Sequence, residues 1–103
     1  MSGSFVRVMP ASDIPAGDKK AVEVNGKLVL VCNNGERFFA ISALCSHAEE
    51  SMERARMAKT WIACPVHGAR FELATGRVLN PPAIKPIATY EIRVVDDWIE
   101  VAV

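Results

Sequence analysis

The fold is decided by one stretch, residues 45–68, which reads CSHAEESMERARMAKTWIACPVHG. It begins with Cys45-x-His47 and ends with Cys64-x-x-His67, so each end carries one thiol and one imidazole. Thiolate and imidazole are both good ligands for iron and zinc, and two loops at neighbouring strand ends can bring such pairs together. The stretch therefore predicts a metal site built from Cys45, His47, Cys64 and His67.

The mixed composition of the two pairs bears on which metal they hold. The ordinary zinc pattern places two cysteines in one half and two histidines in the other, so a mononuclear zinc site in a zinc-stabilised interaction domain fits less well. A binuclear centre explains the mixture if each loop gives its cysteine to one iron and its histidine to the other. The remaining alternative is that the histidines are surface residues and the cysteines are small buried hydrophobes.

On both sides of this stretch, short apolar or alternating runs are separated by turn residues, which predicts an all-β domain. Asn25-Gly26 favours a type I′ hairpin turn, and a second turn at 33–35 completes a three-stranded meander. Asp96-Asp97 should join the last two strands, and residues 10–20 have loop composition with room for one helical turn. The expected strands are 5–8, 21–24, 28–32, 37–41, 61–63, 70–73, 88–95 and 98–103.

One segment favours a helix instead. Residues 48–57 have helix-forming composition, and Ser46 and Glu49 have the spacing of a capping box. We expect one or two helical turns there.

The ligand pattern and its surroundings resemble the Rieske [2Fe-2S] family, in which Cys-x-His is followed after 15 to 17 residues by Cys-x-x-His. The resemblance covers essentially the whole chain and continues through the following positions: Pro65, Gly68, Phe71, Thr75-Gly76 and Pro81-Pro82-Ala83. It implies one [2Fe-2S] cluster, with Cys45 and Cys64 on the inner iron and His47 and His67 on the outer iron. It also implies a single domain, 1–103, in which a β-sandwich base carries a small cluster-binding subdomain of two ligand loops at about 42–82.

The resemblance also bears on the reduction potential. Respiratory Rieske proteins carry an extra cysteine in each ligand loop, which together form a disulfide, but Glu50 and Val66 occupy those places here. The same proteins place a serine and a tyrosine where this chain has Ala69 and Phe71, so two donors to the cluster sulfurs are missing. We expect a potential near the low end of the Rieske range, about −150 mV.

A low-potential cluster on one small domain resembles the ferredoxins of bacterial aromatic-ring-hydroxylating dioxygenase systems. That resemblance implies a one-electron carrier between a flavin-containing, NAD(P)H-dependent ferredoxin reductase and the Rieske centre of a terminal oxygenase. We expect no catalytic residue, because the chain has only two histidines and both are committed to the cluster. The alternatives are a nitrite-reductase small subunit or a ferredoxin of another oxygenase.

Composition excludes several other partners. Twelve basic residues balance twelve acidic ones, so there is no general attraction to nucleic acid or to an anionic membrane. No apolar run approaches the roughly 20 residues of a membrane span, and the N-terminus does not resemble a secretory signal. Three cysteines are too few for a disulfide framework. We expect a cytoplasmic protein, and a monomer.

Three further features remain. Cys32 lies in an apolar run without a neighbouring histidine, so we expect a packing residue. The proline loop at 81–83 resembles the one that shields the cluster in this family. The insert 49–59 is either a solvated face with local ion pairs or a segment that orients partners. Its charged residues are Glu49, Glu50 and Glu53, followed by Arg54, Arg56 and Lys59.

Overall fold

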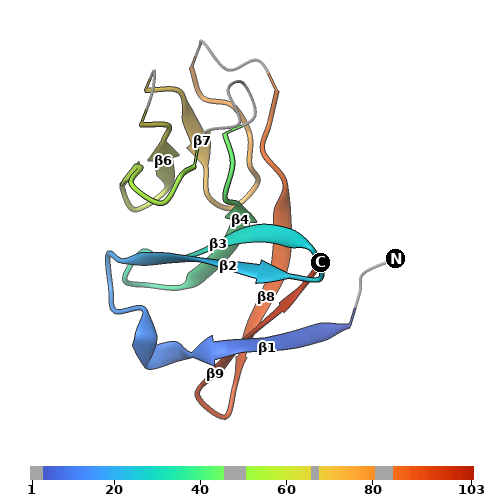
Figure 1. Ribbon diagram of the computed structural model, residues 1–103. Coiled ribbons are helices and arrows are strands. Elements are labelled where there is room, and N and C mark those ends of the chain that lie inside the picture. The colour runs from blue at the N-terminus through green and yellow to red at the C-terminus, as the bar shows by residue number, and fades with distance from the viewer. Residues whose placement is uncertain (1–3, 46–50, 66–67, 81–84) are drawn as a thin grey trace.

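The computed structural model describes residues 4–45, 51–65, 68–80 and 85–103 (Figure 1). This part of the chain is built from strands and one short 3₁₀ turn, which confirms the all-β prediction. The only helical element among the described residues, η1, is three residues long and cannot cross a membrane. The elements are β1 (Phe5–Pro10), η1 (Ala11–Asp13), β2 (Lys19–Val24), β3 (Lys27–Asn33), β4 (Phe38–Ser42), β5 (Arg56–Met57), β6 (Trp61–Ala63), β7 (Arg70–Glu72), β8 (Thr89–Val95) and β9 (Trp98–Ala102).

The expected meander is present as strands β2, β3 and β4. The first two are antiparallel and close at Val24 and Lys27, around a turn in which Asn25 and Gly26 have φ of 50° and 82°. These positive angles are those that a type I′ turn requires, which explains the Asn-Gly pair. β3 then pairs antiparallel with β4 over Val29–Asn33.

The remaining long strands complete a six-stranded sheet in the order β1-β9-β8-β4-β3-β2. The β8–β9 hairpin turns at Asp96 and Asp97, where φ is 51° and 66°, and β4 meets β8 through only two residue pairs. Figure 1 shows this sheet folded over so that β1 and β9 lie below β2 and β3. The two layers enclose a base core, which confirms the sandwich prediction; its buried members are Met9, Ile14, Val24, Val29, Val31, Ala40, Ile99 and Val101.

A second, three-stranded sheet in the order β5-β6-β7 lies at the other end of the molecule from the β8–β9 hairpin (Figure 1). Its inner face packs on the sandwich through a second cluster, here called the ligand-side core. The buried members of that core are Leu30, Cys32, Phe39, Ile41, Ala43, Cys45, Met52, Ala55, Ile62, Cys64, Ala69, Phe71, Leu73 and Ile87.

Strand β3 belongs to both cores because its side chains alternate. Val29 and Val31 face the base core, whereas Leu30 and Cys32 face the ligand-side core. Successive strand residues point to opposite faces, so a strand covered on both sides is apolar throughout. This explains the continuous apolar run that begins at Leu28.

The helix expected at 48–57 is wrong for the described part of that segment. Ser51 forms a bridge with Leu44, the Ala55 N–H donates to the Met52 carbonyl at 3.0 Å in a single tight turn, and residues 56–57 are strand β5. The charged composition favours a helix, but pairing with β6 holds the backbone of residues 56–57 in an extended conformation. The expected capping box lies outside the described residues.

Candidate metal centre

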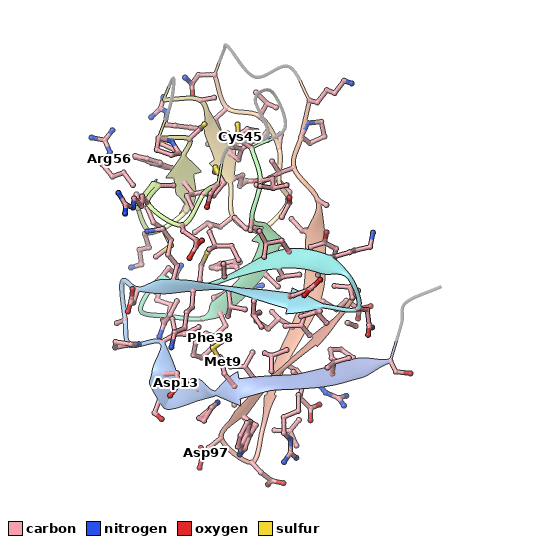
Figure 2. The ribbon with its side chains drawn as sticks, viewed as in Figure 1. Met9, Asp13, Phe38, Cys45, Arg56 and Asp97 are labelled. Atoms are coloured by element: carbon pink, nitrogen blue, oxygen red, sulfur yellow. The ribbon has the colours of Figure 1, made fainter. Side chains whose placement is uncertain are left out.

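Cys45 lies just beyond β4, at the base of the first ligand loop. The Ala43 N–H donates to the Leu28 carbonyl at 3.0 Å, and the Met52 N–H donates to the Ala43 carbonyl at 2.7 Å. The first bond ties this segment to the end of the β2–β3 hairpin. The second bond, with the bridge between Leu44 and Ser51, brings together the two chain segments that flank 45–50. The Cys45 side chain is 1% exposed, and Figure 2 shows it at the small-sheet end of the molecule.

Cys64 occupies the matching position after β6, in the turn that leads to β7. Its N–H donates to the Ala69 carbonyl at 2.7 Å, and its own carbonyl accepts from the Gly68 N–H at 2.9 Å. These two bonds close the second ligand loop at Cys64, which is 2% exposed. The backbone pairing between β6 and β7 therefore fixes the position from which this thiol projects.

The two cysteines fit a cluster in their chemistry and burial. Neither forms a disulfide, both belong to the ligand-side core, and each starts a loop at the same end of the fold. Buried thiols that form no disulfide at two neighbouring loops are suited to bind a metal as thiolates. His47 and His67 lie outside the described residues, as do Glu50, Val66 and the proline loop.

Asn80 braces the second ligand loop. Its Oδ1 accepts from the Arg70 N–H at 2.9 Å and from the Arg70 Nε at 3.1 Å, while its Nδ2 donates to the Gly68 carbonyl at 3.4 Å. No spacing or motif in the sequence points to Asn80, because its partners Arg70 and Gly68 lie ten and twelve residues earlier. It connects the chain before 81 to the loop that carries Cys64.

Cys32 also belongs to the ligand-side core, but its surroundings differ from those of a ligand. Its side chain is completely buried within β3, and its Sγ lies 3.9 Å from the Leu30 carbonyl oxygen. Burial raises the pKa of the Cys32 thiol to about 12, with a smaller opposing effect from the charge of Lys19. Cys32 is therefore a protonated packing residue, as predicted.

The side chains at positions 69 and 71, after the second ligand loop, carry no hydroxyl group. Ala69 and Phe71 are both completely buried in the ligand-side core. Neither side chain can donate a hydrogen bond, which agrees with the expectation that two sulfur donors are missing.

A pocket of about 340 Å³ opens beside the second ligand loop. Its walls are Arg54, Arg56, Ala63, Cys64, Pro65 and Gly68. One side of this pocket is thus the ligand loop itself, and the other is the arginine-bearing chain that leads into β5.

Residues 4–91 match the Rieske [2Fe-2S] domain. The chain belongs to this family. Rieske domains hold a [2Fe-2S] cluster, so this cluster is the cofactor that the family assigns to the chain. The match spans both ligand loops and most of the sandwich.

The Rieske relatives include ferredoxin components of dioxygenase systems. The chain is 32% identical to the ferredoxin component of the naphthalene 1,2-dioxygenase/salicylate 5-hydroxylase systems of a Ralstonia species, over 91% of this chain and 90% of that protein. It superposes on the ferredoxin of carbazole 1,9a-dioxygenase from Nocardioides aromaticivorans IC177 with a TM-score of 0.89 and 34% identity, covering 96% and 97% of the two chains. A chain in a solved complex of reduced oxygenase and oxidized ferredoxin of carbazole 1,9a-dioxygenase also gives a TM-score of 0.89, with 28% identity and coverage of 95% and 92%. These relatives are electron-carrying components, not catalytic subunits.

Proposed function

We propose that this Rieske protein carries single electrons from a flavin-containing, NAD(P)H-dependent reductase to the Rieske centre of a terminal aromatic-ring dioxygenase. The observation that carries the proposal is the pair of buried cysteines outside any disulfide, each at the base of a ligand loop, in a chain that spans almost the full length of ferredoxin components. The solved ferredoxin–oxygenase complex of a relative supports the oxygenase as the acceptor. A cytoplasmic location and a monomeric state remain predictions.

The proposed ligands are Cys45 and Cys64 on one iron and His47 and His67 on the other. The burial of both thiols supports the first half of this set, and the matched sequence positions support the second. The cluster would supply one-electron chemistry, and residues of about 42–82 would form its binding subdomain. The apolar side chains at 69 and 71 support a potential near the low end of the Rieske range, about −150 mV.

Three measurements on the purified protein test this proposal. Iron and acid-labile sulfide should be present in equal amounts at two per chain, and Cys45→Ala or Cys64→Ala should abolish both while Cys32→Ala retains them. Voltammetry should give a low potential, and a value above about +100 mV would contradict the donor argument. A colourless protein with one zinc per chain would refute the cluster.

Electron flow needs a separate experiment. The protein should be reduced by NADH only when a flavoprotein ferredoxin reductase is present, and it should be reoxidised by a dioxygenase component with its aromatic substrate. Coupling to a nitrite reductase instead would establish the alternative function.

A further inference from the structure

The outer face of the small sheet carries a concentration of positive charge. Strands β5, β6 and β7 alternate, so Met57, Ile62 and Phe71 point into the ligand-side core. The intervening residues point outward, and they include Arg56 and Arg70. Figure 2 shows Arg56 projecting away from the body of the molecule.

Trp61 holds two of these arginines close together. The Arg56 guanidinium lies 5.7 Å from the centre of the Trp61 ring, and the Arg70 guanidinium lies 5.3 Å from it. A tryptophan face attracts a cation, which offsets part of the repulsion between two like charges. The ring thus organises the positive face without neutralising it.

Two acidic side chains of this region, Glu53 and Glu72, have partners other than Arg54 and Arg56. Glu72 pairs with Arg77 at 3.6 Å and accepts from the Thr75 hydroxyl at 2.6 Å. Glu53 lies 3.5 Å from the Ser51 hydroxyl. Among the described residues, no carboxylate forms an ion pair with Arg54 or Arg56. Glu49 and Glu50 lie outside the described residues.

Arg54 and Arg56, without an ion pair in the described part of the chain, line the pocket beside Cys64. The pocket has about 340 Å³ of space, and Cys64 and Gly68 also line it. A planar guanidinium forms paired, charge-assisted hydrogen bonds with a carboxylate. An acidic side chain that enters here would bring its protein directly against a loop that carries a cluster ligand.

We infer that the Arg54–Arg56 pocket receives a carboxylate from an acidic surface of the redox partner. This inference rests on the proposed function, because the pocket adjoins the loop that carries the proposed ligands Cys64 and His67. The whole chain has no net charge, so attraction of a partner must come from local charge, which governs encounter rate and orientation. Arg54 and Arg56, which form no ion pair with another described residue, provide that attraction beside the second ligand loop.

The first test uses a small anionic oxidant, so that no partner protein is needed. The reduced holoprotein is mixed in a stopped-flow instrument with ferricyanide or with the cation hexaammineruthenium(III), at low and high ionic strength. Oxidation by ferricyanide should slow as salt is added, whereas oxidation by the cation should not. Arg54→Gln and Arg56→Gln should each lower the low-salt ferricyanide rate by about two- to fivefold, because each removes a positive charge beside the second ligand loop.

Two variants serve as controls. Arg54→Lys retains the charge and should keep the ferricyanide rate. Arg7→Gln removes the same charge from strand β1, at the other end of the fold, and should have no effect (Figure 1). Equal rates for wild type, Arg54→Gln and Arg56→Gln at low salt would overturn the inference.

The second test uses proteins: the reductase and oxygenase components of the Ralstonia naphthalene dioxygenase system. Arg54→Gln should raise the KM for the ferredoxin with at least one component and leave kcat unchanged, and Arg54→Lys should restore only part of the loss because it cannot form the paired bonds. Unchanged KM values with both components would overturn the pocket's role in docking. Absence of turnover with the wild-type protein would instead count against the proposed function, while the ferricyanide result still decides whether the pocket attracts anions.

Discussion

At the scale of single residues, the three cysteines are equally buried but differ in what surrounds them. Cys45 and Cys64 each follow the end of a strand, where a loop can present the thiol to a metal. Cys32 lies within a strand that is covered on both faces, so its thiol packs in the core. The sequence alone could separate the three, because Cys45 and Cys64 each have a histidine two or three residues later and Cys32 has none nearby.

The raised pKa of Cys32 predicts a specific pH dependence of stability. The pKa of the Cys32 thiol is about 12 in the folded state and its ordinary value is 9.0. The thiol's contribution to the free energy of unfolding is therefore complete below pH 9 and is lost as the pH rises toward 12. Between pH 8 and pH 10 the unfolded chain gains about 1.4 kcal/mol from releasing this proton. The stability difference between wild type and Cys32→Ala, read from urea midpoints of cluster absorption, should shrink by about this amount from pH 8 to pH 10. An unchanged difference would mean that Cys32 keeps an ordinary pKa.

Asn80 predicts a positioning effect on the second ligand loop. Asn80→Leu removes the side-chain hydrogen bonds to Arg70 and Gly68, and this should lower the free energy of unfolding by about 1–2 kcal/mol. Release of iron to a chelator should become several-fold faster. Asn80→Asp keeps the acceptor for Arg70 and loses the 3.4 Å donation to Gly68, so iron release should remain near the wild-type rate. Equal rates of iron release for wild type and Asn80→Leu would show that Asn80 does not hold the loop.

At the scale of elements, the strands that were predicted best are those with strong local patterns. The Asn-Gly turn and the apolar run after it determined the β2–β3 hairpin, because turn geometry and side-chain alternation agree there. Strand β5 has only two residues, and its pairing of Arg56 with Ala63 depends on a partner from outside the segment. No periodicity can reveal so short a strand, and this is why a helix was predicted instead.

The turn after β7 makes Gly76 the most sensitive glycine of the described ligand end. Gly76 has φ of 77°, and a Cβ at this position would collide with the carbonyl oxygen of Ile87, whose own N–H donates to the Gly76 carbonyl at 3.0 Å. Gly76→Ala therefore combines strain at a positive φ with a clash against the Ile87 backbone. It should lower the free energy of unfolding by more than about 3 kcal/mol.

Gly26→Ala provides the matched control for that prediction. Gly26 has φ of 82°, but a Cβ there would meet nothing within 4 Å. The Gly26→Ala variant should lose only the strain energy of a positive φ, about 1–2 kcal/mol of its free energy of unfolding. Urea midpoints of the two variants measure the difference, and equal losses would show that the contact with Ile87 relaxes without cost.

At the scale of the whole molecule, β3 and β4 connect two cores with different roles. The base core is closed by the sandwich, and the ligand-side core contains Cys45 and Cys64. Burial of β3 on both faces explains its long apolar run, but the run alone could not show which face meets the ligand loops. That assignment depends on the register of β3 with β4, in which Leu30 lies opposite Ile41.

Two isoleucines test whether these cores unfold together. Ile41 and Ile99 are both completely buried, the first in the ligand-side core and the second in the base core, and an alanine at either should cost about 2–5 kcal/mol. Local openings need not involve the whole fold, so Ile41→Ala should speed iron release to a chelator without denaturant by tenfold or more. Ile99→Ala should lower the urea midpoint by a similar amount while iron release stays near the wild-type rate. If both variants release iron equally fast, the cluster is lost only through global unfolding, and the two cores form one cooperative unit.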